Sequence, residues 1–253
     1  MKQLNRAVRA TVGAVVVILA ATTIASADPV SIVLDSRHTG AGARVQDTVQ
    51  SDLDIASDLL TSTAMVMTGA SVAAASASLT SSFANPLHWF GIGTADGFTT
   101  SQGTVGAYTT TASFVVNFDV TESVAYAFNG RLQASSFTSQ PPSEPGDSVW
   151  SILLAIRTGG GPLPTLFADQ ASGAAVRSFV GTLAPNQYLM QVTARNSGNI
   201  VAGTRSADAG FNFTFDLAPG APAPVPEPVS MLLLGTGLVG LFGYRCRTGN
   251  RRP

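Results

Sequence analysis

Hydrophobic and polar residues alternate with a period of two along several parts of this chain. The clearest run is 113–120, in which Phe114, Val116, Phe118 and Val120 fall on one face. A period of two places successive side chains on opposite faces of an extended backbone, so the run predicts a strand with one buried face. On the same grounds we expect further strands at 30–34, 62–68, 124–128, 149–157, 176–183, 188–194 and 211–215.

Turn-forming residues separate these runs. Asn129-Gly130 predicts a tight turn after the strand at 124–128, and Gly- and Pro-rich clusters predict turns at 91–93, 140–146 and 159–162. The segment 46–77 shows no clean helical stripe, so we expect strands there although its alanines favour a helix on propensity. Many short strands predict an all-β fold, and we expect a single β-sandwich domain, jelly-roll-like, over residues 28–217.

The first 27 residues have the three parts of a secretory signal peptide. A positively charged start from Lys2 to Arg9 precedes an uncharged, mostly apolar run at 11–24, and Ala25-Ser26-Ala27 follows. Signal peptidase cleaves after such a small-x-small pattern. The sequence therefore predicts a signal peptide at 1–27, with Ala25 and Ala27 at the cleavage site and a mature chain that begins at Asp28.

The C-terminus also has three parts. Residues 218–228 form a Pro/Ala linker, 229–244 form an apolar segment, and 245–253 form a basic tail. The apolar segment is shorter than the roughly 20 residues that span a bilayer, so we expect a marginal transmembrane helix. Arginines directly after an apolar segment indicate the cytoplasmic side. These arginines are Arg245, Arg247, Arg251 and Arg252.

The order of motif, apolar segment and arginines resembles the PEP-CTERM sorting signal of exported bacterial proteins. The motif here is Val225-Pro226-Glu227-Pro228, although Cys246 and 248–250 interrupt the arginines. The resemblance implies cleavage near the motif by an exosortase, a membrane-embedded transpeptidase, in bacteria that make exopolysaccharide. It also implies a protein anchored on the outer face of the inner membrane before processing, and then found on the cell surface or outside the cell.

Charge excludes some partners of the body of the protein. Between Asp28 and Glu227 there are seven arginines, no lysine and all fifteen acidic residues, which gives a net charge of −8. Nucleic-acid and anionic-lipid binding need basic patches, so we expect neither in this region. The one cysteine, Cys246, lies in the basic tail, and the body therefore has no disulfide or thiolate chemistry.

Residues that could carry catalysis are few. The two histidines are His38 and His88, and Glu122 and Glu144 are the glutamates of the body before Glu227. There is no G-x-S-x-G elbow, and no aspartates stand in a recognisable pair for glycoside hydrolysis. The G-x-G-x-x-G pattern at 235–240 lacks the following βαβ unit and acidic residue of a dinucleotide site. We therefore expect no catalytic residue, no metal site and no cofactor.

Two further groups of residues leave alternatives open. Asp47, Asp52, Asp54 and Asp58 could offer oxygen ligands to calcium, but they lack the order of a calcium loop, and a solvated strand edge is the more frequent explanation of such a run. Exposed aromatic side chains could stack on sugar rings, although we expect both tryptophans in the core. The aromatic candidates are Trp89, Trp150, Phe98 and Tyr108.

These observations favour an exported, non-enzymatic protein of the cell surface or the extracellular matrix. Its expected partners are signal peptidase and the export machinery, an exosortase-type transpeptidase, and the membrane through 229–244 before processing. The first alternative is a carbohydrate-binding module for exopolysaccharide, which would show exposed coplanar aromatic side chains. The second is a secreted hydrolase, which would need clustered histidine or carboxylate groups in a cleft.

Overall fold

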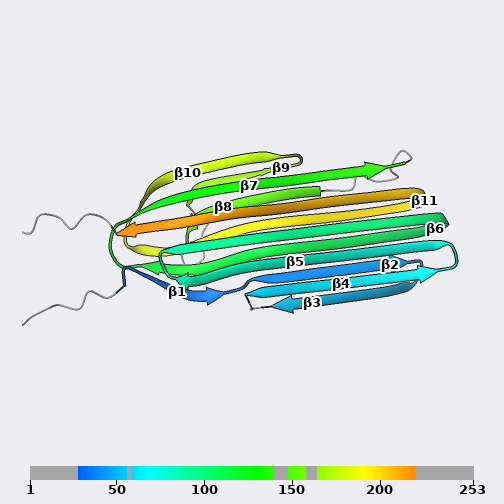
Figure 1. Ribbon diagram of the computed structural model, residues 1–253, viewed down its shortest axis with the longest axis horizontal. Coiled ribbons are helices and arrows are strands. Elements are labelled where there is room, and N and C mark those ends of the chain that lie inside the picture. Colours follow the sequence, from blue (N-terminus) through cyan, green and yellow to red (C-terminus); the bar gives the residue numbers. More distant parts are fainter. Residues whose placement is uncertain (1–27, 56–57, 140–147, 158–163, 220–253) are drawn as a thin grey trace, which may run out of the picture.

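The computed structural model describes residues 28–55, 58–139, 148–157 and 164–219. These residues form antiparallel strands and no helix, which confirms the all-β prediction (Figure 1). The strands are β1 (Val30–Asp35), β2 (His38–Val45), β3 (Thr48–Ile55), β4 (Leu59–Thr68), β5 (Ser71–Asn85), β6 (His88–Val120), β7 (Val124–Thr138), β8 (Ser148–Ile156), β9 (Thr165–Ala171), β10 (Ala175–Leu183) and β11 (Asn186–Pro219).

Two very long strands fold the sheet over on itself. β6 and β11 have 33 and 34 residues, and each reverses direction near its middle, as Figure 1 shows. Gly103 and Gly203 lie at these bends with φ angles of 82° and 97°, which glycine adopts at no steric cost. The two halves of β6 then face each other across the core, where the rings of Trp89 and Phe118 meet edge-on with centroids 4.9 Å apart.

The folded sheet has two layers. The first layer runs β4, β5, the 88–102 half of β6, the 202–219 half of β11, β7 and β10. The second runs β3, β2, the 106–120 half of β6, the 186–200 half of β11, β8 and β9, and β1 also pairs with this half of β6. From β6 onward, the eight segments have the strand order of a jelly roll, so that prediction is confirmed. Strands β1 to β5 widen both layers on one side.

The described chain begins and ends at the same end of the sandwich. Val30 pairs with Val120 at the end of β6, and Pro219 pairs with Val124 at the start of β7. Only the short loop 121–123 separates Val120 from Val124. We call this the proximal end, and the opposite end, with the bends of β6 and β11, the distal end. β11 thus continues two residues beyond the predicted boundary at Leu217, because Ala218 and Pro219 still pair with β7.

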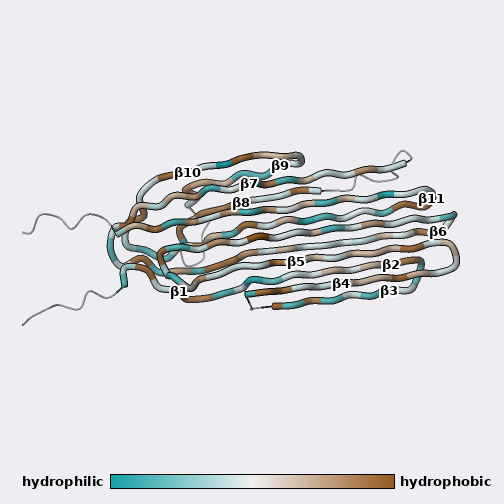
Figure 2. The backbone as a smooth tube through the Cα atoms, viewed as in Figure 1, coloured by the Kyte–Doolittle hydropathy of each residue, from teal (hydrophilic) through white to brown (hydrophobic). Residues whose placement is uncertain are grey.

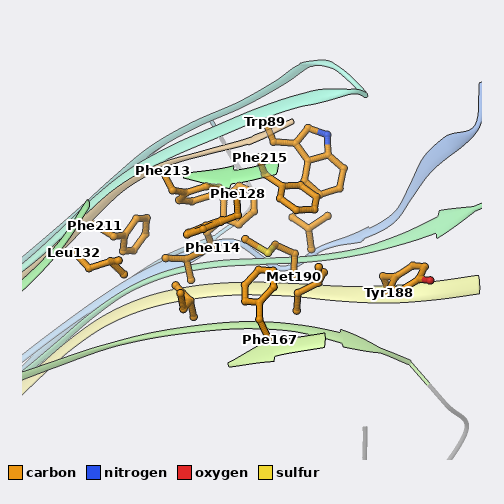
Figure 3. Close-up of a cluster of buried hydrophobic side chains, with 14 of the residues drawn as sticks. Trp89, Phe114, Phe128, Leu132, Phe167, Tyr188, Met190, Phe211, Phe213 and Phe215 are labelled. Atoms are coloured by element: carbon orange, nitrogen blue, oxygen red, sulfur yellow. The ribbon is translucent and has the colours of Figure 1, made fainter. Parts of the chain in front are cut away.

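Aromatic side chains fill the proximal half of the core, where both layers point their rings inward (Figure 3). The distal half is lined mainly by small residues, with Tyr108 as its one aromatic member among the described residues. In both halves, hydrophobic and hydrophilic residues alternate along the strands, which places one set of side chains in the core (Figure 2). The largest fully buried side chains are Trp89, Trp150, Tyr188, Phe114, Phe118, Phe128, Phe213, Phe215, Leu60, Leu79, Leu132 and Ile152.

Glycines in the strands make room for these rings. A Cβ atom added to Gly93 would lie 2.4 Å from Cζ of Phe211, and one added to Gly97 would lie 2.0 Å from Cδ2 of Tyr108. The turn predicted at 91–93 is therefore wrong. Gly91 and Gly93 belong to β6, and the rings of Phe213 and Phe211 of β11 cover them.

The turn predicted at Asn129-Gly130 is also wrong. β7 continues through both residues, since Asn129 pairs with Ser178 of β10 and Thr214 of β11. Strands on both sides supply the ladder hydrogen bonds that a turn would forfeit, so the tertiary structure overrides the local turn preference.

Polar side chains close one open side of the sandwich. Asp54 accepts a hydrogen bond from the Thr61 backbone N–H at 3.3 Å, and Asp52 accepts one from the Thr63 N–H at 3.0 Å. The side chain of Gln50 accepts a third from the Met65 N–H at 3.0 Å. These side chains of β3 thus occupy the edge of β4, where another strand would otherwise pair.

Candidate binding face on the first layer

The two histidines considered for catalysis lie in different layers of the described part of the chain. His38 lies in the second layer with Nδ1 3.1 Å from the carbonyl oxygen of Ser36, and His88 lies in the first layer, paired with Asp216. Glu122 lies in the exposed loop between β6 and β7, and Glu144 lies outside the described residues. Over residues 28–219, as far as they are described, no group of three or more histidine, cysteine or acidic side chains could hold a metal ion.

The acidic run has structural partners instead. Asp52 and Asp54 accept the backbone hydrogen bonds from β4 described above. Asp58 lies 3.0 Å from Nη1 of Arg37, whose side chain is buried and also bonds Asp35 and Ser81. The solvated-edge interpretation therefore accounts for these carboxylates.

Three of the four candidate aromatic residues are buried. Trp89, Trp150 and Tyr108 pack in the core, and the two indole N–H groups donate to backbone oxygens at 2.9 Å. Phe98 differs, because 39% of it is exposed on the outer face of the first layer. Phe137, which the sequence analysis does not single out, is 62% exposed on the same face. Its place at the end of the alternating run of β7 is the signal that could have revealed it.

Strand register arranges this face in rows that cross β6, β11 and β7. In one row Ser206 of β11 lies between Phe98 of β6 and Phe137 of β7. The two rings are thus anchored two strand spacings apart, which is about 9–10 Å. Toward the proximal end, the next rows are Asp96–Asp208–Ser135, Thr94–Gly210–Gln133 and Ile92–Asn212–Arg131. We call these twelve positions the binding face.

Two carboxylates lie directly opposite each other at the centre of the binding face. Asp96 and Asp208 are a cross-strand pair, and the Ser135 hydroxyl donates to Oδ1 of Asp208 at 2.5 Å. Partial desolvation raises the pKa of Asp96, and the negative charge of Asp208 raises it further. Like charges in directly opposite positions of a sheet are destabilising, so this pair costs stability. The sequence did not reveal it, because the two residues are far apart along the chain.

Two shallow hollows flank this pair. One, of about 180 Å³, includes Ser76, Asp96 and Phe98. The other, of about 400 Å³, lies over Gly210, whose missing side chain leaves space between Thr94 and Gln133. Its remaining lining residues are Ile92, Gly93, Arg131, Phe211 and Asn212.

Asp96 and Asp208 project side by side from the outer surface of one sheet, where both side chains are exposed to solvent. This geometry offers hydrogen-bond acceptors to a ligand that lies across the face.

The predicted targeting residues lie outside the described residues. These are Ala25 and Ala27 of the signal peptide, the motif at Val225, Pro226, Glu227 and Pro228, and the arginines at 245, 247, 251 and 252. In the described ranges there is no helix long and apolar enough to cross a membrane, and the predicted helix at 229–244 is not part of those ranges.

Comparison with solved structures finds carbohydrate-binding domains at low similarity. The xylan-binding CBM22-1 domain of Xyn10C from Paenibacillus barcinonensis is 10% identical, with 78% of this chain and all of that chain covered and a TM-score of 0.23. TmCBM61, solved in complex with β-1,4-galactotriose, is 11% identical over 56% of this chain and 88% of its own, with a TM-score of 0.20. No curated protein sequence matches.

The C-terminus gives a specific match. Residues 224–247 match the PEP-CTERM protein-sorting motif, and this range includes Val225 to Pro228, the apolar segment and the first arginines. The motif prediction is therefore confirmed, and it indicates an exported protein. This chain is a β-sandwich protein that carries a PEP-CTERM sorting motif at its C-terminus.

Proposed function

We propose that this chain is an exported, non-catalytic protein of the cell surface or the extracellular matrix, processed through its C-terminal tail. The match of residues 224–247 to the sorting motif carries this proposal. An exosortase would act near Glu227, and the β-sandwich would then be displayed or released. Signal peptidase would remove residues 1–27 during export.

The character of the sandwich supports a structural role. Its core has two clusters of buried hydrophobic side chains, one rich in aromatic rings and one of mainly small residues, and its open side between β3 and β4 is closed by hydrogen bonds. The histidines lie in different layers, apart from the carboxylate pair of the binding face. The body has no cysteine, so its stability outside the cell would come from packing and from the paired backbone hydrogen bonds of the sheet.

Intact mass spectrometry of the protein from its producing cell tests this proposal. We expect a chain that starts at Asp28 and ends between Pro226 and Pro228, and replacement of Glu227 with Ala should leave the tail uncut. Replacement of Glu122 with Ala, which changes the same charge in a loop of the sandwich, is the control. A wild-type product that retains Arg251 and Arg252 would refute processing of the tail.

A second candidate function is carbohydrate binding. It is favoured by one observation, the exposed Phe98 and Phe137 beside a row of hydrogen-bonding side chains. The two candidates are compatible, because a matrix protein can hold the polysaccharide that surrounds it.

A further inference from the structure

We propose that the binding face holds a neutral, extended glycan that crosses β6, β11 and β7, with sugar rings stacked on Phe98 and Phe137. This inference rests on the second candidate function and specifies its ligand class and its site. The side chains of the binding face come from three adjacent strands that pair along their length, so the fold itself forms the surface that the ligand would meet.

The two phenyl rings set the direction of the chain. Both belong to one row across the strands, and the small Ser206 between them leaves the space above β11 open. Exposed aromatic side chains bury a large apolar area at little entropic cost, and the apolar face of a pyranose ring provides a matching surface. The separation of about 9–10 Å leaves room for one sugar residue between the two that stack. An extended glycan can therefore contact both rings at once.

The neighbouring rows supply the hydrogen bonds that a sugar needs. Asp96 and Asp208 accept hydrogen bonds from hydroxyl groups, and Ser135 holds Asp208 in place. On the proximal side, Gln133 and Asn212 offer both donors and acceptors beside the hollow over Gly210. A ligand with many hydroxyl groups would thus meet a few fixed polar partners, as in other small-molecule sites.

Charge selects among glycans. The two central carboxylates are negative at neutral pH, and the only cation among the twelve positions of the binding face is Arg131, two rows away. An acidic polysaccharide would bring its own carboxylates toward Asp96 and Asp208 without a nearby cation to offset the repulsion. A hydroxyl-rich neutral chain would instead donate to both carboxylates and reduce the cost of holding them together.

Isothermal titration of the full chain in mild detergent tests the inference. The probes are the hexasaccharides of β-1,4-glucan, β-1,4-mannan and β-1,4-galactan, with hexagalacturonate as the acidic counterpart. We expect at least one neutral hexasaccharide to bind, and hexagalacturonate to bind more weakly. Phe98→Ala and Phe137→Ala should each weaken binding about tenfold, comparable with the loss of one aromatic stacking contact.

Matched variants separate the site from general effects. Leu53→Ala truncates an exposed apolar side chain on the other layer and should bind as the wild type does. Both phenylalanines are exposed, so the melting temperatures of their alanine variants should stay close to that of the wild type. Asp208→Asn should weaken binding of the neutral hexasaccharide. It should also reduce the difference in affinity between that hexasaccharide and hexagalacturonate.

Several results would overturn the inference. Neutral hexasaccharides that do not bind, or that bind the Phe98→Ala/Phe137→Ala double variant normally, would show that the face is not a glycan site. Tighter binding of hexagalacturonate would refute the neutral ligand class. A change of mass by light scattering in the double variant, without altered glycan affinity, would assign the face to self-association. None of these results affects the processing of the tail, which mass spectrometry tests separately.

Discussion

The opposed carboxylates of the binding face should make the protein less stable at neutral pH than a variant with one charge removed. In Asp208→Asn the amide oxygen can still accept the hydrogen bond that Ser135 donates, so the change removes charge and little else. Opposed cross-strand pairs bring side chains to about 5 Å, and two unit charges at that distance in water repel by about 0.8 kcal/mol. We therefore expect Asp208→Asn to raise the free energy of unfolding by about 0.5 kcal/mol at pH 7.

The dependence on pH has a definite sign. The pKa of Asp96 is raised in the folded protein above its ordinary value of 3.8, by partial desolvation and by the charge of Asp208. The folded state therefore binds the proton more tightly than the unfolded state, and the wild type loses stability as the pH rises through this raised pKa. The advantage of Asp208→Asn should be largest above that pKa and should shrink as the pH falls below it, because protonation of Asp96 removes one of the two opposed charges.

Urea unfolding followed by tryptophan fluorescence measures the effect, because Trp89 and Trp150 are both buried. Asp96→Asn and the double variant complete a mutant cycle, and the double variant should gain less than the sum of the single gains. Asp47→Asn, which changes the same charge in an exposed turn, is the control. An advantage of Asp208→Asn that does not shrink as the pH falls, or fully additive gains, would refute repulsion between Asp96 and Asp208.

Two further predictions concern the sandwich itself. Gly97→Ala should lower the free energy of unfolding by about 1–3 kcal/mol, since its Cβ would lie 2.0 Å from the Tyr108 ring, whereas Gly40→Ala, whose Cβ meets atoms no closer than 3.8 Å, should be nearly neutral in the same urea assay. Equal stability of these two variants would contradict the close approach of the layers at Gly97. Asp52→Ala/Asp54→Ala should expose the edge of β4 and promote self-association measured by sedimentation velocity, while Asp47→Ala should remain like the wild type. A double variant that sediments as the wild type does would show that these carboxylates do not guard the edge.

Alternation predicted most strands, because the period of two is a local property that burial of one face imposes. The run at 113–120 lies in the second half of β6, and the alternating segments at 30–34, 62–68 and 176–183 all lie in strands. Local turn signals were less reliable. Asn129-Gly130 and the glycines at 91–93 lie inside strands, because their neighbours on both sides supply hydrogen bonds or aromatic rings that only the assembled sheet provides.

The candidate site likewise includes residues that the sequence indicated and residues that only the tertiary structure revealed. Phe98 was already a candidate for sugar stacking, whereas Phe137 and the carboxylate pair were not. Their positions depend on the register of β11 against β6 and β7, which are far apart in the sequence. No local pattern specifies that Asp208 will lie opposite Asp96.

The sequence by itself determined the sorting motif at the C-terminus and the all-β class, because both depend on the order and character of neighbouring residues. Only the tertiary structure decided which strands are central, which aromatic rings are buried and which carboxylates meet. Those outcomes depend on long-range pairing, since the bends at Gly103 and Gly203 bring the halves of β6 and β11 into opposite layers. The inner faces of the layers then bury the tryptophans, and the outer face of the first layer keeps Phe98 and Phe137 in contact with solvent.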